Sequence, residues 1–299
     1  MGVLNGAAHL GAQLASIAAQ THGNWHLICS DDGSTDDSLR LLHQFANAYP
    51  GKVSVRHGPR CGFSANYMSM IRALPKDPGY ICFADQDDIW FPAKIGRALD
   101  LLETHPHRPA LYCGRHLHWY PDTNRMVPAP QFKRPCSLQN AIIENVASGN
   151  TIVLNSAAAA LARNAAARTP QVFAHDWWLY LLVAACNGLI RFDNGPPQIL
   201  YRQHMTNVIG SGRGWRAQVK RKAGVLKGAF SERVAGNIAA LDAVADMITP
   251  EAHHVLNRFS NARQSNGLSR LLALYAVKPY RQNWRDTLGF WGAASLGRI

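Results

Sequence analysis

The segment CFADQDDIW, residues 82–90, carries three aspartates within four positions. Asp85, Asp87 and Asp88 follow the apolar run YICF, which is typical of a buried strand, and Pro92 suits the first turn of a helix. The pattern therefore predicts carboxylates on a loop where a strand ends. Hard carboxylate oxygens at this spacing favour Mg²⁺ or Mn²⁺ held jointly with a phosphate. Capping of the next helix would account for Asp88, but it would leave Asp85 and Asp87 unexplained.

A second acidic pair, Asp31 and Asp32, follows the apolar run NWHLICS in the same way, ahead of a helix for which Ser34 or Thr35 would be the cap. Strand-like segments such as VSVRH then alternate with helical ones such as SANYMSMIRAL. This alternation predicts an α/β fold with a mostly parallel sheet and helices on both of its faces. Ligands bind beyond the carboxyl ends of such strands, so we expect both acidic clusters on one rim of the sheet.

The pattern changes after Gly210, where the strand-like segments stop and five helical segments follow. We expect residues 1–210 to form the domain that holds the site and residues 211–299 to form a basic helical C-terminal region. The glycine-rich SGRG, residues 211–214, is the natural linker between them.

The composition, with 299 residues and 47% hydrophobic content, is that of a globular protein with a full core. Six cysteines without a CxxC pair indicate reduced thiols in a cytosolic setting rather than a disulfide framework. No apolar run approaches the roughly 18 residues needed to cross a bilayer, and the N-terminus lacks the pattern of a signal peptide.

The net charge of +12 is concentrated in the C-terminal region. Residues 1–210 hold 17 Lys and Arg against 14 Asp and Glu, whereas residues 211–299 hold 14 against 5. A basic tail can be a solvated surface, or it can attract anionic lipid, nucleic acid or a polyanionic substrate. The last two helical segments mix Arg with Leu, Trp and Phe, as an interfacial amphipathic helix does, and packing on the main domain is the alternative.

SDDGSTD resembles the first acidic motif of the family 2 glycosyltransferases, and ADQDDIW resembles their D-x-D motif at a compatible distance downstream. The chain also carries, in the family's order, NGAAHLGAQLASIAAQT, GFSAN, SGNTIVLN, HDWWL and YRQHMTNVIG, so the resemblance covers residues 2 to about 210. Within the family, the chain is similar to bacterial rhamnosyltransferase-type members that build cell-surface polysaccharides. The resemblance implies a GT-A fold, a Rossmann-like sheet that binds a nucleotide-sugar together with a divalent metal, and a reaction that inverts the anomeric centre.

The resemblance also implies a role for each matching residue. The implied nucleotide-sugar contacts are Asp31, Asp32, Asn66 and Asp85. The implied Mn²⁺ or Mg²⁺ contacts are Asp87, Asp85 and His204, with Asp88 as a helper and Arg202 as a cationic neighbour. The implied catalytic base is Asp176, and the implied acceptor contacts are His175, Trp177, Trp178 and Gly149.

These roles have a physical basis apart from the resemblance. Cleavage of a sugar-diphosphate bond leaves a charged leaving group that a divalent cation stabilises, and a hydroxyl acceptor needs a carboxylate to take its proton. Each residue also has a plainer interpretation. Asp176 would be stabilised by the dipole of its helix, and His204 would be a structural histidine. Trp177 and Trp178 would pack in the core, and because neighbours on a helix point in different directions, at most one of them would face the cleft. Gly149 would allow a turn of the backbone.

The chain departs from the family pattern at its start, MGVLNG, where most of a first strand is missing and Val3 and Leu4 stand where Thr and Tyr are common. We expect either that translation begins upstream or that the chain is a weakened form. GFSAN also lacks the basic residue often found before Asn66, and Arg60 is the candidate to replace it.

Two other functions compete with transfer of a sugar. A sugar-1-phosphate nucleotidyltransferase would need a cation-bearing glycine-rich loop after the first strand, and NGAAHLGAQ has none. A degenerate nucleotide-binding protein is the second. The presence of Asp87 and Asp176 argues against it, whereas the missing first strand leaves it open. The tail shows no nucleic-acid recognition pattern. We therefore expect an inverting transferase on the cytoplasmic membrane face that passes a sugar, rhamnose or another hexose, from a dTDP- or UDP-sugar to a glycan or lipid-linked acceptor.

Overall fold

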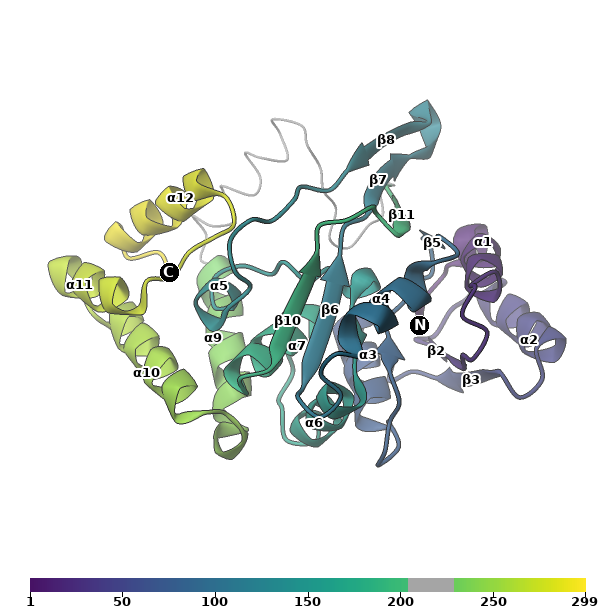
Figure 1. The fold of residues 1–299 in the computed structure, drawn as a ribbon, viewed down its shortest axis with the longest axis horizontal. Coiled ribbons are helices and arrows are strands. Elements are labelled where there is room, and N and C mark those ends of the chain that lie inside the picture. Colours follow the sequence, from purple (N-terminus) through teal and green to yellow (C-terminus); the bar gives the residue numbers. More distant parts are fainter. Residues whose placement is uncertain (204–228) are drawn as a thin grey trace.

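The computed structural model describes residues 1–203 and 229–299 (Figure 1). It confirms the α/β class, with a strand-containing body followed by C-terminal helices. The strands are β1 (Gly2–Val3), β2 (Leu27–Asp31), β3 (Val53–His57), β4 (Ile81–Cys82), β5 (Ile89–Trp90), β6 (Ala110–Gly114), β7 (Leu117–Tyr120), β8 (Arg125–Pro128), β9 (Val153–Leu154), β10 (Leu189–Asp193) and β11 (Ile199–Arg202). The α-helices are α1 (Ala7–Ala18), α2 (Ser38–Ala48), α3 (Phe63–Arg72), α4 (Lys94–Leu102), α5 (Leu138–Ala141), α6 (Ser156–Ala166), α7 (His175–Ala185), α9 (Ala229–Asp242), α10 (Pro250–Gln264), α11 (Gly267–Val277) and α12 (Trp284–Ser295).

The strands form a mixed arrangement in three groups, with the orders β1-β2-β3, β10-β6-β9-β4 and β5-β11-β7-β8. The first group is parallel throughout, as the β-loop-α alternation predicts. In the second, β9 runs antiparallel between β6 and β4, and in the third β11 is parallel to β7 but antiparallel to β5. The parallel strands within each group therefore end at the same edge of the sheet. The antiparallel strands extend the second and third groups by further backbone pairing.

The short first strand is paired with its neighbour. Gly2 lies opposite Ser30, and Val3 lies opposite Asp31 in β2. The backbone N–H of Ser30 donates to the Met1 carbonyl at 2.9 Å, which continues the ladder. The backbone groups at the end of β2 are thus satisfied, so the residue that ends the strand, Asp31, has a fixed position.

Helix α7 forms the centre of the core. Its sequence is apolar on every side, and a helix of this kind must be buried all round. Trp178 and Leu182 are fully buried in one cluster with Val234 and Leu241 of α9 and Phe259 of α10. The inner faces of the C-terminal helices therefore pack on the main body, which was the alternative to an interfacial role. The predicted linker and the 210/211 boundary lie outside the described residues.

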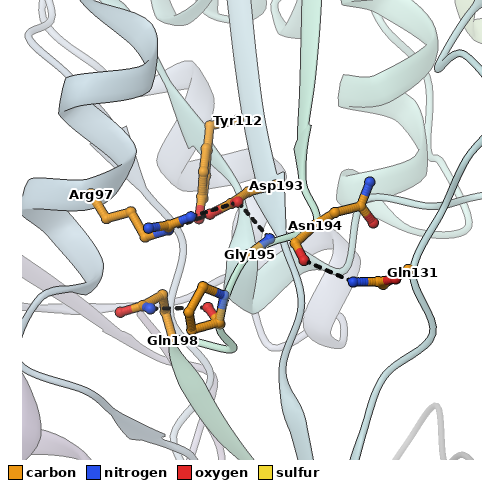
Figure 2. A network of polar contacts seen from close by, with 8 residues as sticks. Arg97, Tyr112, Gln131, Asp193, Asn194, Gly195 and Gln198 are labelled. Atoms are coloured by element: carbon orange, nitrogen blue, oxygen red, sulfur yellow. Dashed lines mark hydrogen bonds and ion pairs between the residues drawn. The ribbon is translucent and has the colours of Figure 1, made fainter.

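A partly buried ion pair fastens α4 to the strands beneath it (Figure 2). Arg97 on α4 holds both carboxylate oxygens of Asp193, at the end of β10, with Nη2 at 2.9 Å from Oδ1. The hydroxyl of Tyr112 on β6 donates to the same carboxylate at 3.0 Å, and the backbone N–H of Gly195 donates at 2.8 Å. Burial alone would raise the pKa of Asp193, but these donors outweigh it and hold the pKa below its usual value. The pair fixes α4, the helix that follows the DQDD loop.

Among residues 1–203 and 229–299, no helix is both long and apolar enough to span a bilayer.

Candidate active site

Asp31 and Asp32 follow one another at the end of β2, but they differ in what they can bind. Asp31 Oδ2 accepts the backbone N–H groups of Gly33 and Ser34 at 3.2 and 3.1 Å, while its buried Oδ1 has no hydrogen-bond partner within the described ranges. Asp32 uses both oxygens to accept backbone N–H groups of the 58–62 loop, at 2.7 and 2.9 Å. Because a buried carboxylate oxygen without a partner is costly, Asp31 is the better placed of the two to receive a ligand donor.

Asn66, predicted to contact the nucleotide-sugar, is buried and engaged inside the protein. Its Oδ1 accepts the Ser30 hydroxyl at 2.6 Å, and its Nδ2 donates to the Ser30 carbonyl at 2.9 Å. The structure therefore places Asn66 as a link between α3 and β2 rather than as a free ligand group. Arg60 lies beside the Asp31 turn, because its side chain would be 3.2 Å from a Cβ at Gly33, where φ is +102°. This position suits the substitute basic residue that the sequence predicts.

Asp85 lies in the loop after β4, as predicted, and Tyr67 holds it there. The Tyr67 hydroxyl on α3 is 3.0 Å from Asp85 Oδ1 and 2.6 Å from the Ala84 carbonyl. Burial, followed by repulsion from Asp87, raises the pKa of Asp85 to about 6. Asp176 also contributes to this shift, so the structure brings the D-x-D loop and the start of α7 together. Close carboxylates of this kind create a site that favours a cation.

The other residues of the DQDDIW loop fix its shape. Asp88 is fully buried, and its Oδ2 accepts the side-chain amide of Asn150 at 2.6 Å. Burial raises the pKa of Asp88 well above its usual value. Arg202 donates through Nε to the Asp87 carbonyl at 2.9 Å, which joins β11 to the loop. Gln86 exchanges two hydrogen bonds with the Leu4 backbone, at 2.8 and 3.0 Å, and so holds the turn after β1.

Asp176 occupies the first turn of α7 and is only partly buried, whereas the residues on either side of it are buried. Its Oδ1 accepts the Trp177 backbone N–H at 2.6 Å. Burial raises the pKa of Asp176 to about 6, against hydrogen bonds from Trp177, Asn145 and Gly149 that lower it. A carboxylate with a pKa near neutrality and some access to solvent is suited to act as a general base.

His175 and Gly149 shape the surroundings of this carboxylate. The His175 ring stacks on Tyr67 with centroids 3.9 Å apart, so Tyr67 contacts both α7 and Asp85. A Cβ at Gly149 would lie 3.2 Å from His175 Nε2 and 3.5 Å from Asp176 Cβ, which explains a glycine here. Burial lowers the pKa of His175 to about 3, so the ring is neutral at pH 7. His175 is buried, which favours a positioning role over direct contact with an acceptor.

The predicted acceptor platform of Trp177 and Trp178 is wrong. Trp178 is fully buried, and Trp177 is buried with its indole N–H donating to the Ala141 carbonyl at 2.7 Å. Both belong to the main core cluster, because α7 has helices or strands on every side. The plainer interpretation, core packing, is correct for both residues.

A wall of aromatic and imidazole side chains beside the carboxylates was not foreseen. The ring of Tyr201 on β11 lies 5.0 Å from that of His116 and 6.0 Å from that of His118 on β7. Burial raises the pKa of Tyr201, and the negative charges of Asp85, Asp88, Asp87 and Asp176 raise it further. The alternation of His and aromatic residues in HLHWY, at the period of a strand, was the available signal.

Comparison with known proteins decides the family. The sequence profile described as "Glycosyl transferase family 2" matches residues 1–168, more than half of the chain. The chain belongs to glycosyl transferase family 2. It is therefore a glycosyltransferase.

Relatives agree with this assignment, and solved structures share the fold. The chain is 28% identical over 254 residues to "dTDP-rhamnosyl transferase RfbG" of Shigella flexneri, covering 82% of this chain and 85% of that one. It is 28% identical over 93 residues to "UDP-Glc:alpha-D-GlcNAc-diphosphoundecaprenol beta-1,3-glucosyltransferase WfaP" of Escherichia coli, covering 31% of this chain and 36% of that one. S. aureus TarS 1–349, with 15% identity, superposes with a TM-score of 0.57 over 92% of this chain and 70% of that one. The same TarS fragment in complex with UDP-GlcNAc superposes with a TM-score of 0.54 and 16% identity, over 91% of this chain and 78% of that one, which shows a shared fold.

The carboxylates of this family 2 chain fit a divalent cation that a ligand phosphate would help to hold. Within the described ranges, no three His, Cys, Asp or Glu side chains are grouped to hold a metal by themselves. Mg²⁺ and Mn²⁺ are commonly bound by one or two carboxylates together with phosphate oxygens, and Asp85 and Asp87 are the carboxylates that such a site would use. His204, the third predicted contact, lies outside the described residues.

Proposed function

We propose that this glycosyltransferase moves a sugar with inversion, from a nucleotide diphosphate donor to a hydroxyl of a glycan or lipid-linked acceptor. The observation that carries the proposal is the position of Asp176. Its partly exposed carboxylate, with a pKa raised by burial to about 6, lies near the D-x-D aspartate Asp85. A donor diphosphate at the loop and a base on α7 would thus lie on two sides of one reaction centre.

Asp31 is proposed to bind the nucleobase. Uracil and thymine each present one ring N–H between two carbonyl groups, and such a donor would satisfy the buried Asp31 Oδ1. The ring of either base would also lie near Arg60, whose side chain runs along Gly33. Asp32 and Asn66 support this pocket from behind, because their hydrogen bonds hold the 58–62 loop and β2.

Asp87 and Asp85 are proposed to hold Mn²⁺ or Mg²⁺ together with the donor diphosphate. The cation would stabilise the negative charge that develops on the departing diphosphate. The protein's own contribution is to keep the two carboxylates in place, through Tyr67 for Asp85 and through Arg202 for the backbone of Asp87.

Asp176 is proposed to take the proton of the acceptor hydroxyl as this oxygen attacks the sugar opposite the leaving group. One displacement of this kind inverts the anomeric centre and needs no covalent nucleophile. Gly149 and His175 keep Asp176 in position, because the backbone of Gly149 packs against the His175 and Asp176 side chains and the His175 ring stacks on Tyr67. Tyr201 is proposed to line the acceptor side.

The donor is proposed to be a dTDP- or UDP-linked hexose, with rhamnose the first candidate. This rests on the relative named a dTDP-rhamnosyl transferase, which matches most of the chain. A lipid-linked acceptor is supported by the shorter match to a glucosyltransferase whose name specifies a diphosphoundecaprenol substrate. Such an acceptor would place the enzyme at the cytoplasmic face of a membrane.

The test is nucleotide release from dTDP-rhamnose, UDP-glucose and UDP-GlcNAc in the presence of a diphosphate-lipid-linked GlcNAc acceptor. One donor should be turned over with Mn²⁺, and EDTA or Asp87→Asn should lower the rate by about 100-fold or more. Asp77→Asn is the matched control, because Asp77 is an exposed aspartate at the other end of β4. Turnover that is unchanged in Asp87→Asn, or no turnover of any donor by the folded protein, would contradict the proposal.

A further inference from the structure

The exposed large apolar side chains of the described residues are concentrated on α11 and α12. Eleven such residues are exposed, and six of them lie between residues 268 and 296. These six are Leu268, Leu272, Tyr275, Trp284, Leu288 and Leu296, each at least 61% exposed, whereas the other five are at most 47% exposed. Large apolar patches of this kind mark a binding surface more often than ordinary solvated surface.

Helix α11 has two apolar faces. Leu274 and Val277 are buried in the main core cluster. Leu268, Leu272 and Tyr275 follow one another at intervals of four and three residues, so they share one face, and this face is exposed. Packing on the body of the protein explains the first face but not the second. The outer face therefore needs a partner of its own.

Helix α12 repeats this arrangement. Phe290 and Ala294 are buried, while Trp284 and Leu288, one turn apart, are exposed, and Leu296 is exposed just after the helix ends. The two helices pack against each other and lie together at one end of the molecule (Figure 1). We call the six exposed residues the outer face of α11 and α12.

The charges around the outer face are mostly positive. Residues 267–299 contain five Lys and Arg and a single acidic residue, Asp286. Lys278 and Arg285 are exposed and lie beside aromatic members of the face, with Lys278 Nζ 5.9 Å from the Tyr275 ring and the Arg285 guanidinium carbon 5.5 Å from the Trp284 ring. Arg298 is also exposed. Leucine, aromatic and basic residues together are typical of a helix that lies in the headgroup region of a bilayer.

We propose that the outer face of α11 and α12 docks on the surface of an anionic lipid bilayer. The alternative of a second copy is disfavoured by charge, because a symmetric contact would bring together two surfaces that both carry the excess positive charge of Lys278, Arg285 and Arg298. An anionic surface pairs with these cations and also covers the leucines. The proposal deepens the proposed function, because a lipid-linked acceptor would then be presented by the same bilayer.

The test is sedimentation of the full chain with vesicles, without donor or acceptor, so that a failure of docking is separate from a failure of catalysis. The vesicles contain phosphatidylcholine alone or equal parts of phosphatidylcholine and phosphatidylglycerol. We expect binding to the mixed vesicles, and Leu272→Gln with Leu288→Gln should weaken it by at least about tenfold. Lys278→Gln with Arg285→Gln should weaken it by roughly tenfold and reduce the preference for phosphatidylglycerol. Substitution is a sharper test than deletion of the tail. A deletion would also remove the six Lys and Arg of residues 204–228, so it would not separate their charge from the outer face.

Met126→Gln is the matched control, since Met126 is an exposed apolar residue on β8, outside both helices. It should bind vesicles as the wild type does. The Leu272→Gln, Leu288→Gln variant should keep its melting temperature and its turnover of a water-soluble acceptor, because both leucines are exposed. Wild-type protein that ignores the mixed vesicles, or a leucine variant that binds them equally well, would overturn the proposal. A wild-type dimer in sedimentation velocity that this variant loses would assign the face to self-association instead.

Discussion

Replacing Asp176 by Asn should make the protein more stable and less active. Burial raises the pKa of Asp176 from the usual 3.8 to about 6, which means that ionisation of this group destabilises the folded state relative to the unfolded one. A shift of about 2 pH units corresponds to about 3 kcal/mol at pH 8, since each unit is worth about 1.4 kcal/mol. The helix dipole favours the charge by about 0.3–1 kcal/mol, and partial exposure reduces the cost, so a net gain of about 1–2 kcal/mol is expected for the variant.

The sign of the effect depends on pH. Below pH 3.8 the carboxyl is protonated in both the folded and the unfolded chain, so the variant gains nothing there. Between pH 3.8 and about 6, Asp176 ionises in the unfolded chain but stays mostly protonated in the folded one, so the loss of folding stability grows with pH. Above that range the loss has reached its full value. At pH 4.5 the gain should therefore be about a third of its value at pH 8. Asparagine keeps the Oδ1 acceptor for the Trp177 N–H, so the helix start is preserved.

Urea unfolding at both pH values, followed by tryptophan fluorescence, measures this difference. Glu251→Gln is the control, because Glu251 is exposed in the first turn of α10, so its neutralisation should lower stability by at most about 1 kcal/mol, the opposite sign to Asp176→Asn. Transfer by Asp176→Asn should fall by about 100-fold or more, and wild-type turnover should fall about tenfold for each pH unit below 6. A variant that is destabilised, or a gain that is the same at pH 4.5 and pH 8, would refute the reasoning.

Three further substitutions probe the support of the site. Tyr67→Phe removes the 3.0 Å hydrogen bond to Asp85, so the pKa of that carboxyl should rise further, Mn²⁺ affinity at pH 6 should fall, and unfolding in urea should cost about 1 kcal/mol less. Gly149→Ala places a methyl group 3.2 Å from the His175 ring; turnover should drop about tenfold while dTDP affinity in calorimetry stays the same. Arg97→Met leaves the buried Asp193 carboxylate without its bidentate partner and should cost about 1–3 kcal/mol at pH 7 in urea unfolding. That cost should shrink below pH 4, where the unfolded chain becomes protonated, and a cost independent of pH would contradict this account.

The placement of the acidic clusters could be predicted because it depends on local pattern. An apolar run that gives way to aspartates marks the end of a buried strand, and Asp31 is indeed the last residue of β2. The position of Asp85 after β4 follows by the same reasoning. The unforeseen part of this rim, Tyr67 and Tyr201, comes from α3 and β11, which lie far away in the sequence and reach Asp85 only through the fold.

Other predictions failed because tertiary contacts override local pattern. Ser34 and Thr35 do not cap α2, which begins at Ser38. The acceptor role for the two tryptophans of α7 was foreseeably weak, because HDWWLYLLVAA is apolar all round and so predicts a fully buried helix.

Calorimetric titration of dTDP and UDP, with and without Mn²⁺, tests most directly whether these carboxylates form one nucleotide-sugar site. We expect one nucleotide to bind the wild type more tightly with Mn²⁺. Asp31→Asn should weaken binding about tenfold with or without the metal, Asp87→Asn should remove only the metal-dependent part, and Asp176→Asn should bind as the wild type does. If all three variants bind like the wild type, or if Asp176→Asn alone abolishes binding, the assignment of base, metal and nucleotide contacts is wrong.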